Sequence, residues 1–168
     1  MKYPNVQLCI CTNGLLLKEY AEYIFELGVR YITVTINAVS PHIGKNIYSW
    51  IIYDKKIWRG YEAAKKLIEN QLAGVQKSAD LGMLVKINSV LIPNINDFHM
   101  VEISKKVKEL GAYIHNIMPL IPLAELNHIR PPTCDLLRSI RNQCERVLPQ
   151  FRLCKQCRAD ACSIPGLE

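Results

Sequence analysis

Four runs of mainly apolar residues recur along the chain, and each run contains polar residues that we expect to end a strand. The runs are VQLCICTNG (6–14), YITVTINA (31–38), LVKINSVLIP (84–93) and YIHNIMPLIP (113–122). Many of their apolar residues are β-branched and occupy consecutive positions, which is typical of strands that are covered on both faces of a parallel sheet. The four runs therefore predict four parallel strands.

Amphipathic helices are predicted between these strands. Residues 17–28 and 98–111 both place apolar side chains at helical spacing, namely Tyr20, Ile24 and Leu27, and Met100, Ile103, Val107 and Leu110. Leu-Gly pairs at 27–28, 81–82 and 110–111 predict helix ends, because glycine tolerates the left-handed turn that caps a helix. Asp97 is predicted to cap the helix that follows it. Residues 40–59 form a Trp- and Tyr-rich insertion, which we expect to cover a site before a helix begins near Gly60.

The alternation of strands and helices indicates right-handed βαβ crossovers and an α/β fold. At 168 residues the chain falls short of a complete eight-stranded barrel, which needs about 250 residues. We therefore expect a partial (β/α) barrel of roughly four units.

We expect a polar residue to end the strand in each run, and chemistry in parallel α/β folds sits at the carboxyl ends of strands. These residues are Thr12-Asn13-Gly14, Thr35 and Asn37, Asn88-Ser89, and His115-Asn116. Together they predict a site for a polar ligand. The same residue types also favour turns and helix caps, so each has a structural alternative.

Charge and targeting signals limit the possible partners. The net charge is +6, but lysines and arginines are mixed with acidic residues and form no stripe interleaved with aromatics, so we expect no nucleic-acid binding. No apolar run approaches the roughly 20 residues of a membrane span. The sequence begins without a secretory signal pattern, so we predict a cytoplasmic protein with reduced thiols.

Seven cysteines therefore suggest metal ligands or buried apolar residues rather than disulfides. Cys134 and Cys144 lie in a segment with helical apolar spacing, and we assign both to packing. Cys154 and Cys157 form a C-x-x-C pair, which suits a redox dithiol, a zinc site or an iron–sulfur site. A redox dithiol would usually open a helix after a strand, and zinc would need a second pair. Arg152, Lys155 and Arg158 place positive charge around the pair.

Several segments, in order along nearly the whole chain, closely resemble the NifB family of radical S-adenosylmethionine (SAM) proteins, the maturases of the nitrogenase cofactor. They are CTNG (11–14), YITVTINAV (31–39), WRGYEAAKKLIENQLAGV (58–75), LVKINSVLIPNIND (84–97), HNIMPLIPL (115–123) and LCKQCRADAC (153–162). The resemblance implies a radical SAM partial barrel with SAM and [4Fe-4S] clusters as cofactors. It also implies fusion of two [4Fe-4S] units into a carbide-containing eight-iron precursor. The implied partners are cluster donors and a cofactor carrier or scaffold protein.

The resemblance also implies roles for individual residues. Cys9, Cys154 and Cys157 match positions that supply thiolates to precursor clusters, which makes iron–sulfur ligation the preferred interpretation of the C-x-x-C pair. Cys11 stands where the family usually has serine, and we assign it to packing. Cys162 and His115 are left outside the metal set. The positions expected to line the SAM pocket are Asn13, Thr35, Asn37, Asn88 and Ser89.

One family motif has no counterpart in the chain. The C-x-x-x-C-x-x-C motif holds the SAM-anchoring cluster, but the cysteine separations here are 2, 123, 10, 10, 3 and 5. We expect the first two strands and the cluster loop to be missing, so that the fold is incomplete at its N-terminus and the chain is inactive alone. Residues 1–124 are then the remaining barrel, and residues 125–168 form a C-terminal helix and cluster-binding tail.

Two other functions stay open. The half barrel could be a non-enzymatic iron–sulfur carrier or scaffold, or an adapter completed by a partner that contributes the missing strands. In every case, a barrel without its first strands exposes a sheet edge, which predicts self-association.

Overall fold

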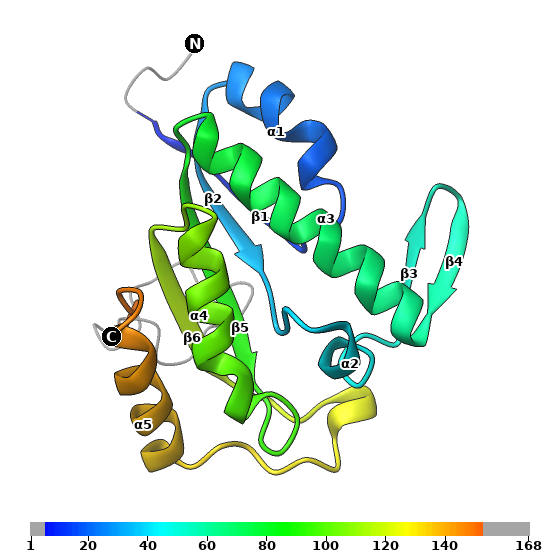
Figure 1. The fold of residues 1–168 in the computed structure, drawn as a ribbon, viewed down its shortest axis with the longest axis vertical. Helices are drawn as coiled ribbons and strands as arrows, with labels where there is room; N and C mark the ends of the chain where they lie inside the picture. The colour runs from blue at the N-terminus through cyan, green and yellow to red at the C-terminus, as the bar shows by residue number, and fades with distance from the viewer. Residues whose placement is uncertain (1–5, 153–168) are drawn as a thin grey trace.

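The computed structural model of the protein describes residues 6–152. Its main sheet contains β1 (Leu8–Thr12), β2 (Val29–Thr35), β5 (Leu84–Leu91) and β6 (Ile114–Pro119). The strand order is β1-β2-β5-β6, and all neighbouring strands are parallel (Figure 1). These strands coincide with the four predicted runs, so the α/β class and the parallel sheet are confirmed.

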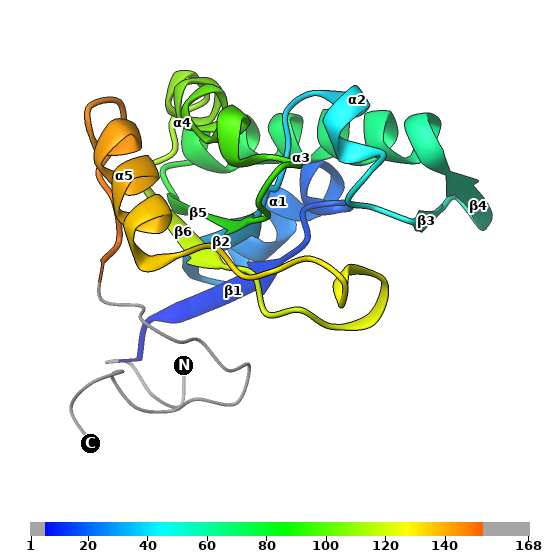
Figure 2. The same ribbon diagram turned by 90° about the horizontal axis from the view of Figure 1, so that it is seen from below.

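Helices cover one face of this sheet (Figure 2). They are α1 (Leu17–Glu26), α3 (Gly60–Asp80) and α4 (Met100–Glu109), with α5 (Cys134–Glu145) beside α4 near the β6 edge. The main core lies between sheet and helices and includes Ile32, Ile87 and Ile117 from the strands and Val75, Ile103 and Ile140 from the helices. Because Ile140 belongs to this core, α5 packs with the barrel units, although it lies beyond the predicted boundary at residues 124–125.

The opposite side of the sheet, which we call the open face, carries the alternate residues of each strand. Ile10 packs against the helix-covered core, so Cys9 and Cys11 point to the open face. In the same way, Ile32 and Val34 lie in the core and leave Thr33 and Thr35 on the open face. Side chains on this face are less covered than the core, and polar residues are frequent among them.

Residues 40–59 form a short helix and a hairpin. The helix is α2 (Pro41–Gly44), and the hairpin pairs β3 (Trp50–Tyr53) with β4 (Lys56–Arg59). Both turn residues of the hairpin, Asp54 and Lys55, have positive φ angles, which a two-residue primed turn requires. The hairpin packs on the start of α3 through a small apolar cluster that contains Leu15, Ile51, Ala63 and Leu67.

Details of the predicted helices need correction. In α1, Tyr20 and Leu27 are about half exposed, and the buried residues are Leu17 and Ala21 instead. Asp97 does not cap α4, since it lies in the 3-10 helix η1 (Asp97–His99) and no helix-capping hydrogen bond forms there. The three predicted helix ends are confirmed, because Gly28, Gly82 and Gly111 all have left-handed φ angles.

Of the two cysteines assigned to packing in the last helix, one is buried and the other is exposed. Cys144 is fully buried in the main core, as predicted. Cys134 is exposed, because it is the first residue of α5, and the assignment to packing is wrong. Cys11 is exposed as well and has no packing role on the core side of β1.

The two edges of the sheet differ. The β6 edge is extended by residues 149–151, where the His115 amide donates to the Pro149 carbonyl (2.9 Å) and the Phe151 amide donates to the His115 carbonyl (2.8 Å). Within residues 6–152, β1 pairs only with β2. No helix in this part of the chain has the length and apolar character to cross a bilayer.

Candidate functional site

A row of polar side chains crosses the open face. The row lies at the last residue of β2 but inside β5 and β6, which end at Leu91 and Pro119 rather than at their predicted polar residues. The register places Thr35 of β2 beside Asn88 of β5, and Asn88 beside Asn116 of β6. The Asn116 Nδ2 donates a hydrogen bond of 3.1 Å to Oδ1 of Asn88. Asn116 is almost fully buried, and its own Oδ1 is a buried acceptor without a hydrogen-bond partner. Such an orphan acceptor in a polar row is suited to a ligand that carries N–H or O–H donors.

The turn after β1 contains Asn13 and is built around Gln71 of α3. The Gln71 Nε2 donates to the carbonyl oxygens of Asn13 (2.7 Å) and Thr35 (2.8 Å), and so joins the ends of β1 and β2. The Asn13 Oδ1 accepts from the Leu15 amide, so this side chain supports the turn. Gly14 has a φ of +79°, and a Cβ there would lie 2.8 Å from Val34, so only glycine fits.

Asn37 stabilises the loop that follows β2. Its side-chain Oδ1 accepts from the Val90 backbone N–H (2.9 Å), and its own backbone N–H donates to the Tyr48 hydroxyl (3.0 Å). Burial of that hydroxyl raises the pKa of Tyr48 to about 12, so Tyr48 stays neutral. Asn96 also donates to the Asn37 carbonyl (2.9 Å). Asn37 therefore holds the ends of β2 and β5 together, and its Oδ1 is already satisfied.

Ser89 lies on the helix-covered side of β5, unlike its neighbour Asn88. Its hydroxyl donates to the Ile36 carbonyl and its oxygen lies 2.8 Å from Nε2 of His115. The Nδ1 of His115 lies 2.9 Å from the Ser104 hydroxyl of α4. Burial lowers the pKa of His115 to about 3, so the ring is neutral. This network is fully buried and links the sheet to α4, away from the polar row on the open face.

Thiols and a lysine lie on the open face farther from the strand ends. Cys9 lines a cavity of about 470 Å³ together with Thr33, Lys86 and Phe151. Burial raises the pKa of the Cys9 thiol, the neighbouring Cys11 raises it further, and Lys86 lowers it. The Lys86 Nζ also lies 4.9 Å from the centre of the Phe151 ring. A positive charge thus lies beside a thiol-bearing surface, which favours an anionic ligand such as a metal–thiolate cluster.

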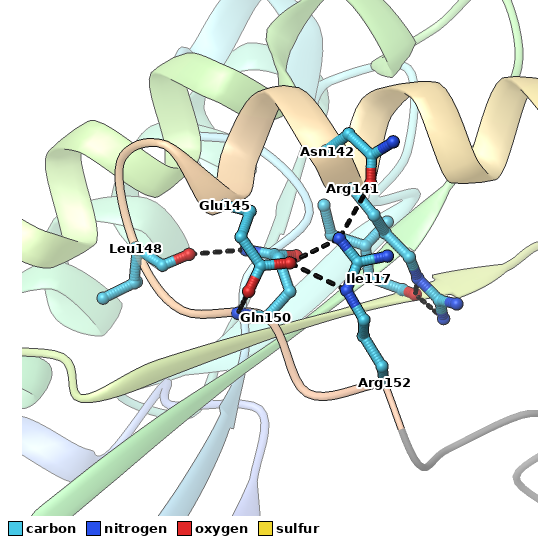
Figure 3. A network of polar contacts seen from close by, with 7 residues as sticks. All are labelled: Ile117, Arg141, Asn142, Glu145, Leu148, Gln150 and Arg152. Carbon is cyan, nitrogen blue, oxygen red and sulfur yellow. Dashed lines mark hydrogen bonds and ion pairs between the residues drawn. The ribbon is translucent and has the colours of Figure 1, made fainter.

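Cys154 and Cys157 lie outside the described residues, and a polar network fixes the segment that leads to them (Figure 3). The Arg152 guanidinium donates to Glu145 and to Oδ1 of Asn142 (2.8 Å) at the end of α5. The Arg152 side chain lowers the pKa of Glu145, so the carboxylate stays ionised. The Arg152 charge expected beside the C-x-x-C pair is therefore neutralised by Glu145.

A second cavity, of about 610 Å³, lies among the loops that follow β2, β5 and β6. Its polar lining residues include Lys45, Ser49, Glu125 and His128, and the Ser49 hydroxyl donates to Glu125. These loops lie beyond the carboxyl ends of the strands, where ligands of parallel α/β folds bind.

The sequence predicted Asn116 as a polar residue of the site, but it did not predict Lys86 and Cys11 as members of the open face. Strand alternation could have found them, because Cys9, Cys11 and Asn13 share one parity in the first run, and Lys86 and Asn88 share one parity in the third. Cys11 was assigned to packing because the family usually has serine at this position. The assignment is wrong, since Cys11 is exposed and shares the parity of Cys9.

The described residues fit the expected cofactors in part. The unpaired Oδ1 of Asn116 is an acceptor and the Nδ2 of Asn88 is a donor, and together they suit a polar cofactor such as SAM. Cys9 and Cys11 are the right donors for iron, since thiolates are the usual ligands of iron–sulfur clusters. Among residues 6–152, however, no group of three or more Cys, His, Asp or Glu side chains could hold a metal ion, so a complete ligand set needs further residues.

Comparisons with known proteins agree with this fold. A crystal structure of a radical SAM methyltransferase from Sphaerobacter thermophilus matches with a TM-score of 0.64. The match covers 85% of this chain and 39% of that protein, at 15% sequence identity, so it supports the fold alone.

Curated relatives are much closer in sequence. The FeMo cofactor biosynthesis protein NifB of Methanocaldococcus jannaschii is 52% identical over 160 residues, which cover 95% of this chain and 53% of that protein. The protein of the same name from Bradyrhizobium diazoefficiens is 46% identical, over 97% of this chain and 34% of its own length. The chain thus spans about half of the first relative and a third of the second.

A family model described as the radical SAM superfamily matches residues 2–107. Together with the names of the relatives, this match implies [4Fe-4S] clusters and SAM as cofactors, as the sequence predicted. Since the model matches more than half of the residues, the chain belongs to the radical SAM superfamily.

Proposed function

We propose that this chain is the part of a NifB-type nitrogenase cofactor maturase that supplies one wall of the SAM site and some thiolates for the precursor clusters. In this role the complete maturase fuses two [4Fe-4S] units into a carbide-containing eight-iron precursor. One observation carries the proposal: the polar row of Thr35, Asn88 and Asn116 and the thiol of Cys9 lie on the same open face of the sheet.

The polar row is proposed to bind SAM. The hydrogen bond from Asn116 to Asn88 orients both amides, leaving the Asn88 Nδ2 as a donor and the Asn116 Oδ1 as an acceptor. SAM offers amino and hydroxyl donors for the acceptor and carboxylate, ribose and ring acceptors for the donor. When bound, a reduced [4Fe-4S] cluster supplies the electron for SAM cleavage, and the proposed task of these amides is to hold SAM in place.

The thiols are proposed to bind iron of a precursor cluster. Cys9 and Phe151 line the same cavity, so the C-terminal segment reaches the open face just before the C-x-x-C pair. Cys154 follows Phe151 by three residues and Cys157 by six. An extended chain spans about 3.3–3.6 Å per residue, which keeps both thiols within reach of this cavity. Lys86 would offset the negative charge of the cluster.

The partners that we propose are iron–sulfur cluster donors and a carrier or scaffold protein that receives the product. A second candidate function is supported by the exposed thiols of β1: a non-enzymatic iron–sulfur carrier made of the same half barrel. The two functions differ in what the chain does alone. A carrier binds a cluster by itself, whereas the maturase segment cleaves SAM only when it is joined to a cluster-binding N-terminal part.

The test fuses this chain to an N-terminal segment that carries a C-x-x-x-C-x-x-C cluster motif. The maturase proposal predicts reductive SAM cleavage by the anaerobically reconstituted fusion protein and none by the chain alone. Asn88→Ala should reduce cleavage strongly, while Gln143→Ala, which alters an exposed amide on α5, should not. Cluster binding by the chain alone, lost in Cys154→Ser with Cys157→Ser, together with an inactive fusion, would favour the carrier.

A further inference from the structure

Cys9 and Cys11 form a pair of thiols on one side of an edge strand. Ile10 between them packs against the core, so both cysteines face the open side, and both are exposed. In the described part of the chain, β1 has no neighbour other than β2, so these thiols lie beside an uncovered edge. An exposed cysteine contributes little to packing, and two of them on one face call for another explanation.

The spacing of this pair suits a shared metal. Residues two apart in a strand have α-carbons about 6.6–6.8 Å apart. Two thiolates on one tetrahedral metal ion lie about 3.8 Å apart, because each metal–sulfur bond is about 2.3 Å. The two side chains therefore need to lean toward each other by about 1.5 Å each.

The surroundings favour a soft cation with thiolate ligands. Lys86 lies on the same face and lines the same cavity as Cys9, and a neighbouring positive charge favours thiolate over neutral thiol. Cys11 pairs with Thr33, which in turn pairs with Lys86, so no acidic residue lies in this row of the register. Thiolates without carboxylates select soft metals such as iron in clusters, zinc or cadmium over magnesium or calcium.

We propose that Cys9 and Cys11 act together as a two-thiolate ligand on β1, so that Cys11 is a second iron ligand beside the one expected at Cys9. This inference rests on the proposed function in taking iron of a precursor cluster as the natural occupant. The pair itself can be tested without SAM and without the C-terminal cysteines.

The experiment measures Cd(II) binding to the full-length chain with Cys154, Cys157 and Cys162 all changed to Ser, under reducing, anaerobic conditions. The probe is Cd(II) alone, followed by its thiolate charge-transfer absorption in the ultraviolet. Into this background we introduce Cys9→Ser, Cys11→Ser or Cys134→Ser. Cys134 is the matched control, because it is also exposed but lies on α5. Circular dichroism verifies that each variant is folded.

We expect one Cd(II) ion bound through two thiolates, and an affinity about tenfold or more weaker in both Cys9→Ser and Cys11→Ser, with no change in Cys134→Ser. The proposal is overturned if Cys11→Ser binds Cd(II) like Cys134→Ser, or if the background chain binds no Cd(II). Because SAM cleavage by the fusion protein is a separate measurement, failure of the maturase proposal leaves this result interpretable.

Discussion

The side chain of Asn116 donates a 3.1 Å hydrogen bond to that of Asn88 and so links the neighbouring strands β5 and β6 on the open face. The bond settles the orientation of both amides, because Asn88 must present its oxygen to Asn116. It also leaves the Oδ1 of Asn116 buried and without a partner. A buried acceptor without a partner lowers the free energy of unfolding, and a ligand that donates a hydrogen bond to it removes this penalty.

Asn116→Leu should therefore leave the stability of the chain nearly unchanged. The substitution loses one hydrogen bond, worth about 1 kcal/mol, but it also removes a buried acceptor that has no partner. We expect the free energy of unfolding, measured by urea denaturation, to fall by no more than about 1 kcal/mol. A loss of about 3 kcal/mol or more would show that the amide is required for folding rather than for binding.

His115 should make stability depend on pH. Its pKa is about 3 in the folded protein and near 6.5 in the unfolded chain, because the folded protein buries the neutral ring. The contribution is fully present above pH 6.5 and is lost progressively as the pH falls from 6.5 toward 3. The whole shift corresponds to about 5 kcal/mol at most.

The measurement is urea denaturation between pH 7 and pH 4. The His115→Gln protein, which can still hydrogen-bond to Ser89 or Ser104, should lose much of this pH dependence. The His128→Gln protein should keep it, since His128 is exposed in the loop after β6. Identical pH profiles for the unaltered chain and His115→Gln would contradict the assignment of a neutral, buried ring.

The ion pair of Glu145 and Arg152 should hold residues 149–152 against β6. Glu145→Ala removes the acceptor for Arg152 and for the Gln150 amide. We expect hydrogen exchange at the Phe151 amide, which bonds to the His115 carbonyl, to become about tenfold faster. Asp135→Ala is the control, because it removes a similar pair with Arg138 at the other end of α5. Equal exchange in both variants would mean that the pair does not anchor the segment.

The free side of β1 should promote self-association of the isolated chain. Within residues 6–152, β1 has only β2 as a neighbour, and Leu8 at its start is exposed. An uncovered edge offers unpaired backbone groups to another chain, and a lysine on the edge opposes such pairing. Sedimentation equilibrium at micromolar concentration in reducing buffer should show oligomers that Leu8→Lys weakens. A monodisperse monomer for the unaltered chain would contradict this prediction.

The sheet could be predicted from sequence because its strands are continuous apolar runs between clear helix ends. The hairpin of β3 and β4 could not, since its turn uses Asp54 and Lys55 rather than the Asn-Gly or Asp-Gly pair that signals such turns. Asp97 seemed a helix cap by residue type, yet the adjacent Asn96 organises the loop by donating to the Asn37 and Val90 carbonyls. The residue preferences of Asn and Asp for turns and caps are similar. Tertiary contacts therefore decide which of the two organises the loop.

The candidate site could likewise be predicted only in part from the sequence. Residue type correctly placed a polar group at the end of β2, at Thr35, but Asn88 and Asn116 lie inside β5 and β6 rather than at their ends. The functional face depends on parity along each strand. Asn88 and Ser89 are adjacent in sequence, and only Asn88 faces the open side, while Ser89 belongs to the buried network of His115. The partnerless acceptor of Asn116 arises from the register of β5 and β6, which no single segment encodes.

The most direct test of the proposed SAM site is the affinity for SAM of the reconstituted fusion protein, measured at equilibrium for three forms. We expect Asn116→Leu to weaken SAM binding by about tenfold or more relative to the unaltered fusion protein, because a buried hydrogen bond to the ligand is lost. We expect Gln143→Leu on α5 to have no effect. Equal SAM affinity in all three proteins would contradict the claim that the open face binds SAM.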